Sequence, residues 1–283
     1  MEVRVAKPSG FCFGVQRAVD IVAKQVEMGG REPIYTYGPI IHNEEVVRAL
    51  EKKGVRAVED DELESIDKGT MIIRSHGVSK ETEKNMEKMG FNIVDATCPF
   101  VKKIHRTVSE AGIAGKPVLI VGSGKHPEVQ GIIGWCSSPP FVLETVEDIE
   151  KIPFKKDEEI CLVCQTTFNL NKFKEIVDNI RKKGYYINVV NTICNATEER
   201  QSAARELAAL ADCMIVIGGT HSSNSRKLYE ICKMECENTY FIQTLDDLHL
   251  ELPKSVRLVG ITAGASTPNN IIEEVQNYVR NEF

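Results

Sequence analysis

The chain has 283 residues, of which 42% are hydrophobic and 27% charged, so it is long enough for two or three small domains with a buried core. Its formal net charge of −6 at pH 7 argues against a nucleic-acid-binding protein. No run approaches the roughly 18 apolar residues of a membrane span and no apolar signal segment opens the chain, which predicts a cytoplasmic protein without membrane contact.

Short β-branched runs alternate with helical patterns along the whole chain, which predicts an α/β fold with parallel sheets. Three of the predicted strand-to-helix junctions carry a cysteine. In chain order they are VRVAKPSGFCFGV with Cys12, FNIVDATCPFV with Cys98, and INVVNTICNAT with Cys194. These junctions recur at nearly a third of the chain length and therefore indicate an internal repeat.

Two further series of predicted strands follow the same order. About thirty residues after each cysteine a strand ends in a glycine-containing polar loop, in IYTYGPIIHNEE with His42, VLIVGSGKHPEV with His126, and MIVIGGTHSSNS with His221. A third series consists of MIIRSHGVS with His76, ICLVCQTTFNL with Gln165, Thr166 and Thr167, and RLVGITAGASTP with Ser266. The repeat therefore extends over most of the chain.

The repeat predicts three similar α/β domains. We expect the first to span residues 14–96 and the second residues 97–193, while residues 194–283 form a third domain that the N-terminal strand, residues 1–13, completes. Ligands of α/β sheets bind at the carboxyl ends of parallel strands, where all the loops named above lie. A pseudo-threefold arrangement, a trefoil, would bring the three cysteines to one centre.

Nine cysteines in a reducing compartment do not suggest a disulfide framework. Three converging cysteines could ligate zinc or an iron–sulfur cluster, or could be coincidence; with three thiolates, one iron of a 4Fe–4S cluster lacks a protein ligand. Cys161 and Cys164 form a CxxC motif, but positions i and i+3 of a strand point to opposite faces, which favours a structural role. We expect no chemistry from the remaining cysteines, Cys136, Cys213, Cys232 and Cys236.

The polar loops suggest a small phosphorylated metabolite rather than a nucleotide, because the chain has no P-loop and no convincing GxGxxG motif. Hydrogen-bond donors come from His42, His76, His126, Ser222, Ser223, Asn224 and Ser266, and backbone N–H groups at helix N-termini favour phosphate-type anions. The SSNS segment could equally be a helix cap. Glu128 could carry protons or could be an ordinary first-turn helix residue.

These motifs together resemble the 4-hydroxy-3-methylbut-2-enyl diphosphate reductase family, which completes the methylerythritol phosphate route to isoprenoids. The resemblance covers almost the full chain and rests on nine segments in the family's order. They are GFCFGV, IIHN, SHGV, DATCP, HPEV, QTT, TICNAT, SSNS and TAGAST. Each segment alone is weak evidence, whereas nine in order are specific.

The resemblance implies a trefoil of three domains around a central 4Fe–4S cluster held by Cys12, Cys98 and Cys194. It implies a two-electron reductive dehydroxylation of the allylic diphosphate, yielding isopentenyl diphosphate or dimethylallyl diphosphate, with electrons from a donor such as ferredoxin or flavodoxin. Glu128, Thr166 and His126 would act in proton delivery or near the substrate hydroxyl. The residues that would hold the diphosphate are His42, His76, His126, Ser222, Ser223, Asn224 and Ser266, with Gln165 and Asn43 in support.

Three other interpretations remain open. Quinolinate synthase also places one cysteine from each of three domains around a 4Fe–4S cluster, but it needs no external electrons. A non-catalytic iron–sulfur sensor or carrier would have no use for the histidine and hydroxyl loops. A CxxC redox protein would use Cys161 and Cys164 and would be active without iron.

Overall fold

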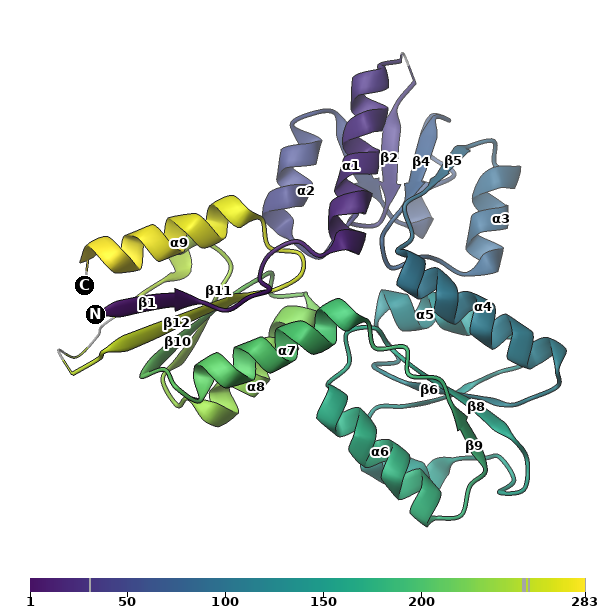
Figure 1. Cartoon of the computed structure of the whole chain (residues 1–283). Helices are drawn as coiled ribbons and strands as arrows, with labels where there is room; N and C mark the ends of the chain where they lie inside the picture. Colours follow the sequence, from purple (N-terminus) through teal and green to yellow (C-terminus); the bar gives the residue numbers. More distant parts are fainter. Residues whose placement is uncertain (31, 251–252, 254, 283) are drawn as a thin grey trace. The chain divides into compact units, whose positions relative to one another are not determined.

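The computed structural model describes residues 1–30, 32–250, 253 and 255–282. Strands in this part of the chain form three four-stranded sheets in which all paired strands are parallel (Figure 1). The predicted α/β fold with parallel sheets is therefore confirmed. No helix in the described ranges combines the length and apolar character of a membrane span.

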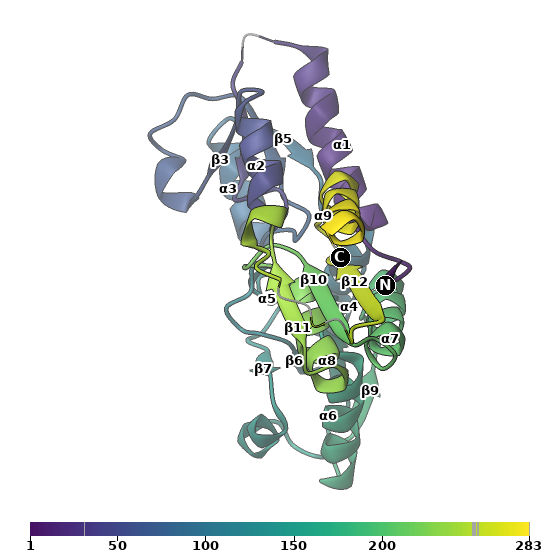
Figure 2. The ribbon, with the colours of Figure 1, turned by 90° about the vertical axis from the view of Figure 1, so that its left-hand side faces the viewer.

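The C-terminal sheet has the strand order β1-β12-β10-β11. Its strands are β1 (Glu2–Val5), β10 (Cys213–Ile217), β11 (Thr239–Ile242) and β12 (Leu258–Ala263), and its helices are α7 (Asn195–Ala208), α8 (Ser223–Glu235) and α9 (Asn269–Glu282). α9 covers one face and α7 and α8 the other (Figure 1 and Figure 2). Along β10, Cys213, Ile215 and Ile217 pack with α9, whereas Met214 and Val216 pack with α7 and α8. This alternation explains why the strand is apolar throughout.

A second sheet has the order β3-β2-β4-β5. Its strands are β2 (Ile34–Tyr37), β3 (Val55–Val58), β4 (Thr70–Ile73) and β5 (Asn92–Asp95), and the helices in this part of the sequence are α1 (Phe13–Met28), α2 (Glu44–Glu51) and α3 (Lys80–Lys88). Tyr35, Met71 and Ile73 pack with Met86 of α3 on one face. Ser79 caps α3 by accepting a hydrogen bond from the Thr82 N–H group (3.0 Å).

The third sheet has the order β7-β6-β8-β9. Its strands are β6 (Val118–Val121), β7 (Phe141–Leu143), β8 (Ile160–Cys164) and β9 (Ile187–Val189), and its helices are α4 (Pro99–Ile113), α5 (Pro127–Ile133) and α6 (Leu170–Lys182). Cys161 packs on the face covered by α4 and α5, and Cys164 packs on the face covered by α6. The expectation that the CxxC residues point to opposite faces is confirmed, so they cannot act as a vicinal dithiol in this conformation.

The chain separates into two compact units. One consists of Met1–Gln16, His42–Arg48 and Asn195–Phe283 and contains the C-terminal sheet; the other consists of Arg17–Ile41 and Ala49–Cys194 and contains the other two sheets. In the first unit β1 pairs with β12, with Val3 opposite Val259, so the N-terminal strand completes the C-terminal sheet. The three domain boundaries stay a prediction, as does the trefoil arrangement.

Candidate functional site

Cys12, Cys98 and Cys194 occupy the same place in three sheets. Each follows an edge strand (β1, β5 or β9) and directly precedes a helix (α1, α4 or α7). All three side chains are half-buried.

Their backbone N–H groups repeat one hydrogen bond. Each donates to a carbonyl in the loop after the neighbouring strand: Cys12 to Ala265 (3.2 Å), Cys98 to Ser75 (2.9 Å) and Cys194 to Thr166 (3.2 Å). Those loops are the ones that the third series of sequence segments defined. The internal repeat is thus visible in the backbone of each cysteine loop.

The other six cysteines differ from these three. Cys161, Cys164, Cys213, Cys232 and Cys236 are buried among apolar side chains, and Cys136 packs at the edge of such a cluster. Burial raises the pKa of Cys136, Cys213 and Cys232 to about 12, so these thiols stay protonated at neutral pH. A neutral buried thiol is a poor metal ligand. This supports the structural role predicted for all six.

Glu128 and Thr166 form the most buried polar pair among the predicted site residues in the unit that holds β6 and β8. Glu128 is 2% exposed and Thr166 is 6% exposed. The Thr166 N–H group donates to Oε1 of Glu128 and the Thr166 hydroxyl donates to Oε2, both at 2.6 Å. Sequence analysis selected both residues but did not predict that they contact each other across 38 positions.

Burial raises the pKa of Glu128, while the two hydrogen bonds from Thr166 oppose that shift. The carboxyl group therefore keeps its proton at pH values where an ordinary glutamate has lost it. Its position is set by the start of α5, where the Nδ1 atom of His126 accepts a hydrogen bond from the Glu128 N–H group (3.1 Å). Pro127 occupies the first helical position, where its missing N–H costs nothing. Together these features place an acid with an elevated pKa beside a hydroxyl group.

His76 and His126 lie next to each other in the same unit. Their ring centroids are 5.4 Å apart and the rings are nearly perpendicular, at 84°. Gln165 ties the two loops of this sheet together, because its Oε1 accepts from the Ser123 N–H group and its Nε2 donates to the Thr167 hydroxyl, both at 3.1 Å. The predicted residues Glu128, Thr166, His126 and His76 thus share one compact unit.

In the other unit, the loops after β10 and β12 both contact the backbone of His42. The Ser266 hydroxyl donates to the His42 carbonyl oxygen (3.1 Å). A Cβ atom at Gly219 would lie 2.7 Å from the same oxygen, so only glycine fits there. Ser222 caps α8 and accepts hydrogen bonds from the N–H (3.3 Å) and hydroxyl (3.0 Å) of Ser225. The predicted residues His42, Ser222 and Ser266 are therefore close in space.

Asn224 is the least satisfied of the predicted ligand-binding residues. It is 4% exposed, and within the described ranges neither its Oδ1 nor its Nδ2 atom has a hydrogen-bond partner. Buried amides are nearly always paired, so an unpaired one at the start of a helix indicates a place for a polar ligand. Ser223 beside it is half-buried, whereas His221, which the repeat also singled out, is exposed.

Asn43 positions the start of α2. Its Oδ1 accepts a hydrogen bond from the Val46 N–H group (3.2 Å), while its Nδ2 is buried without a partner among the described residues.

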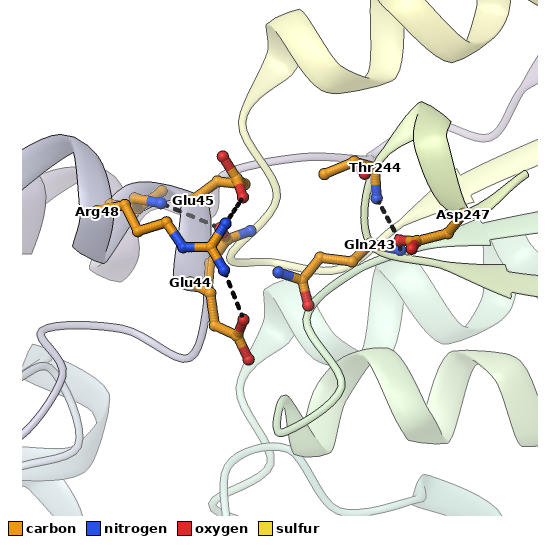
Figure 3. Close-up of polar contacts among 8 residues, drawn as sticks. Glu44, Glu45, Arg48, Gln243, Thr244 and Asp247 are labelled. Carbon is orange, nitrogen blue, oxygen red and sulfur yellow. Dashed lines mark hydrogen bonds and ion pairs between the residues drawn. The ribbon is translucent and has the colours of Figure 1, made fainter.

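Two exposed sets of polar contacts lie outside this cap (Figure 3). On the exposed side of α2, Arg48 forms ion pairs with Glu44 (3.6 Å) and Glu45 (2.9 Å). In a separate turn, the Asp247 carboxylate accepts hydrogen bonds from the N–H groups of Gln243 and Thr244. Exposed pairs contribute little stability, so the cap is what defines the start of α2.

Sequence analysis missed Arg200 and Ser225. Arg200 on α7 is 2% exposed and donates to the carbonyl oxygens of Gly10 (2.5 Å) and Ala196 (3.0 Å), which lie two residues before Cys12 and two residues after Cys194 in the sequence. Ser225 is fully buried beneath Ser222. An arginine in an EER sequence has the pattern of a solvent-exposed helix face, so no sequence signal identified its burial.

These observations define an α/β protein with three parallel sheets, in which Cys12, Cys98, Cys194 and the polar loops each lie at the carboxyl ends of strands. The chain belongs to the LytB protein family, which matches residues 3–280. The resemblance inferred from the nine motifs is thereby confirmed.

Relatives with curated names are similar over nearly their full length. The 4-hydroxy-3-methylbut-2-enyl diphosphate reductase of Caldanaerobacter subterraneus subsp. tengcongensis is 46% identical over 97% of this chain and 95% of its own length. The protein of the same name from Clostridioides difficile is 45% identical over 99% of this chain and its entire length.

Two solved structures to which the chain is similar carry names of the same kind. The E-1-hydroxy-2-methyl-but-2-enyl-4-diphosphate reductase from Plasmodium falciparum matches with a TM-score of 0.92 at 29% identity, over 99% of this chain and 88% of that one. A second structure, described as (E)-4-hydroxy-3-methyl-but-2-enyl diphosphate reductase, the terminal enzyme of the non-mevalonate pathway, matches with a TM-score of 0.70 at 41% identity. The match covers 99% of this chain and 100% of that chain.

Proposed function

We propose that the chain is a 4-hydroxy-3-methylbut-2-enyl diphosphate reductase. It removes the allylic hydroxyl of its substrate with two electrons and two protons, releasing water and giving isopentenyl diphosphate and dimethylallyl diphosphate. Family membership and the names of the relatives support this activity. The observation that carries it is the buried contact between Glu128 and Thr166, because a protonated carboxyl beside a hydroxyl suits the loss of water.

Cys12, Cys98 and Cys194 are the proposed ligands of a 4Fe–4S cluster. The donor set fits: three half-buried thiols lie at equivalent loops, outside the apolar clusters that hold five of the other six cysteines. Soft thiolates are the usual ligands of iron–sulfur clusters. When bound, the cluster would supply electrons and one iron without a protein ligand, an open position for Lewis-acid chemistry.

The diphosphate is proposed to bind His42, His76, His126, Ser222, Ser223, Asn224 and Ser266. The unpaired amide of Asn224 supports this assignment, because a bound phosphate oxygen would accept from its Nδ2. Backbone N–H groups in the first turn of the 13-residue helix α8 add favourable donors for an anion. Asn43 and Gln165 hold the adjoining loops in place, as their hydrogen bonds indicate.

Glu128 is the proposed proton donor to the leaving hydroxyl. Its raised pKa favours the protonated carboxyl, and the Thr166 hydroxyl can accept that proton while it donates its own proton toward the leaving hydroxyl of the substrate. His126 lies two residues before Glu128 in the sequence, and its Nδ1 atom accepts a hydrogen bond from the Glu128 N–H group. We therefore infer that His126 orients the carboxyl group.

The reaction also needs an external reductant, and we infer a small electron-transfer protein of the ferredoxin or flavodoxin type. We also infer a location in the cytoplasm, because nine cysteines without the pattern of a disulfide framework suit a reducing compartment.

Product analysis tests the proposed activity. Cluster-loaded protein is incubated anaerobically with the allylic diphosphate and a chemical reductant in D₂O, and the products are identified by mass spectrometry. We expect isopentenyl and dimethylallyl diphosphate, each carrying one deuterium at carbon, because the hydroxyl leaves as water and one solvent deuteron adds to either of two carbons of the allyl fragment. Recovery of unchanged substrate from cluster-loaded protein would contradict the proposal.

A further inference from the structure

His105, which is buried, and Trp135, which is half-buried, form a ring stack in the unit that contains β4, β5 and α4. Their ring centroids are 5.1 Å apart and the planes differ by 13°. His105 is 5% exposed and lies on α4, while Trp135 follows α5. None of the motifs considered in the sequence includes either residue.

The stack contacts the two residues that follow His76. Gly77 has a φ of +72°, and a Cβ atom at this position would lie 2.8 Å from Cε1 of His105. The glycine backbone therefore rests directly on the imidazole edge. The Trp135 Nε1–H group donates to the Val78 carbonyl oxygen (2.9 Å). One ring supports Gly77 and the other anchors Val78.

Two other proposed site segments adjoin the same stack. The Cβ at Gly77 would also lie 3.0 Å from Cγ2 of Thr97, the residue before Cys98. In α5, whose first turn carries Glu128, a Cβ at Gly131 would lie 3.6 Å from both Nε2 of His105 and the carbonyl carbon of Gly77. The loop bearing His76 is thus fitted between α4 and α5 with His105 beneath it.

We propose that the His105–Trp135 stack is a positioning device that fixes the loop bearing His76 and thereby orients that imidazole toward the diphosphate. The inference rests on the proposed function, which makes His76 a diphosphate ligand. His105 and Trp135 do not themselves touch the substrate; they act through Gly77 and Val78.

The ring of His105 acts through its shape. Its Nε2 atom is buried without a hydrogen-bond partner in the described ranges. Burial lowers the pKa of His105 to about 4, and the charge of Lys102 acts in the same direction while Asp95 opposes it, so the ring is neutral at neutral pH. A planar neutral ring of similar size should therefore substitute for it.

A cavity of about 410 Å³ lies beside the stack, lined among others by Val78, Thr97, His105 and Trp135. His105 thus borders this cavity on one side and the backbone of Gly77 on another, so deleting the imidazole should enlarge the cavity and leave Gly77 free to shift. A shift of about 1 Å in a binding group is enough to weaken function strongly.

Four variants of the cluster-loaded enzyme test the proposal. His105→Ala removes the support, and His105→Phe restores a planar ring. Trp135→Phe keeps a stacking ring and removes the N–H donor to Val78. Ile104→Ala is the matched control: Ile104 is fully buried on the same helix but packs into the core of the third sheet, so it lowers stability without touching Gly77.

The first measurement is the dissociation constant of inorganic diphosphate by calorimetry. We expect His105→Ala to weaken binding about tenfold or more, as changes behind a ligand typically do. Trp135→Phe should have a smaller effect, while His105→Phe and Ile104→Ala should bind like the wild type. KM for the allylic diphosphate should rise in the same order, with a smaller change in kcat. Because Trp135 is the chain's only tryptophan, loss of the stack in His105→Ala should also shift its fluorescence.

A further variant, Asn224→Ala, distinguishes failure of this inference from failure of the proposed function. If Asn224→Ala weakens diphosphate binding and His105→Ala does not, the site stands and the positioning role is wrong. If Ile104→Ala weakens binding as much as His105→Ala, the effect is one of stability and the inference is overturned. If wild-type protein binds no diphosphate, both proposals fail.

Discussion

Glu128 is the proposed proton donor because its carboxyl group is both buried and hydrogen-bonded. The burial opposes ionisation and the two donors from Thr166 favour it, and burial prevails. Folding therefore stabilises the protonated form. A raised pKa suits a general acid, because more of the carboxyl group keeps its proton as the pH rises.

Glu128→Gln tests this role. The variant preserves the size of the side chain but cannot release a proton, so we expect cluster content to persist and kcat to fall by about 100-fold or more. In the wild type, kcat should decline as pH rises through the elevated pKa of Glu128, and the variant should lack that decline. Steady-state rates across the pH range provide the measurement. Wild-type turnover in a fully loaded variant would remove Glu128 from the mechanism.

Asn224 provides a second test at the residue scale. Its amide is buried and has no hydrogen-bond partner among the described residues, so Asn224→Leu should raise the free energy of unfolding by about 1 kcal/mol while abolishing most diphosphate binding. Thr262→Val is the matched control, because the Thr262 hydroxyl in β12 is also buried and has no partner in the part of the chain that the structure describes. It should stabilise to a similar degree and leave binding intact. Denaturant unfolding with diphosphate calorimetry measures both; unchanged binding in Asn224→Leu would contradict the assignment.

The sequence alone predicted which residue types lie at the strand ends, because their spacing and their chemistry can both be read from it. It did not predict which hydrogen-bond partners these side chains have. The Glu128–Thr166 contact joins two motifs 38 positions apart, and the unpaired state of Asn224 depends on everything packed around it. Such properties arise only when the chain is folded.

At the scale of elements, each cysteine loop is built by the same rule. An edge strand ends, the cysteine N–H bonds to the loop after the adjacent strand, and a helix begins. Period-two alternation likewise predicted that Cys161 and Cys164 face opposite sides of β8, and the two apolar clusters confirm it. Local periodicity was sufficient for the two faces of β8, whereas the hydrogen bonds of the cysteine loops could be seen only in the structure.

The buried His105 on α4 should make the folded protein less stable at acidic pH. Its pKa is about 4 in the folded protein and 6.5 in an ordinary environment, with Asp95 and Lys102 as the charged groups that act on it. Between these values the unfolded chain binds a proton that the folded chain does not, so stability must fall as pH decreases. The loss reaches about 3 kcal/mol by pH 4.

Comparing urea unfolding of the wild type and His105→Phe between pH 7 and pH 4 measures this contribution. The variant should lose less stability across the same interval, since it has no proton to bind. Identical pH dependence in the two proteins would show that His105 titrates normally.

At the scale of the whole molecule, the proposed cluster requires cysteines from all three sheets. Cys12→Ser, Cys98→Ser and Cys194→Ser should each lower the iron content and the visible absorption of the anaerobically reconstituted protein. Cys161→Ser and Cys164→Ser are the controls and should retain full iron, because both side chains are buried in apolar clusters. Loss of iron in the control variants, with retention in the other three, would reverse the ligand assignment.

The three-sheet organisation could be predicted from the sequence because each sheet repeats the same order of segments. Membership of β1 in the C-terminal sheet followed from the same repeat, and β1 pairs with β12 as that repeat requires. The grouping of sheets into compact units could not be predicted, since His42–Arg48 clusters with the C-terminal sheet although it lies between β2 and β3 in sequence. That placement depends on contacts distant in sequence rather than on local pattern.

The most direct test of the proposed function is an anaerobic assay of reductant consumption. Reconstituted protein is mixed with dithionite-reduced methyl viologen, and 4-hydroxy-3-methylbut-2-enyl diphosphate is added last while viologen absorbance is followed. We predict bleaching that requires both the cluster and the substrate, with two viologens oxidised per substrate molecule because the reaction consumes two electrons. An intact cluster with no substrate-dependent bleaching would contradict the reductase function and indicate a non-redox cluster enzyme.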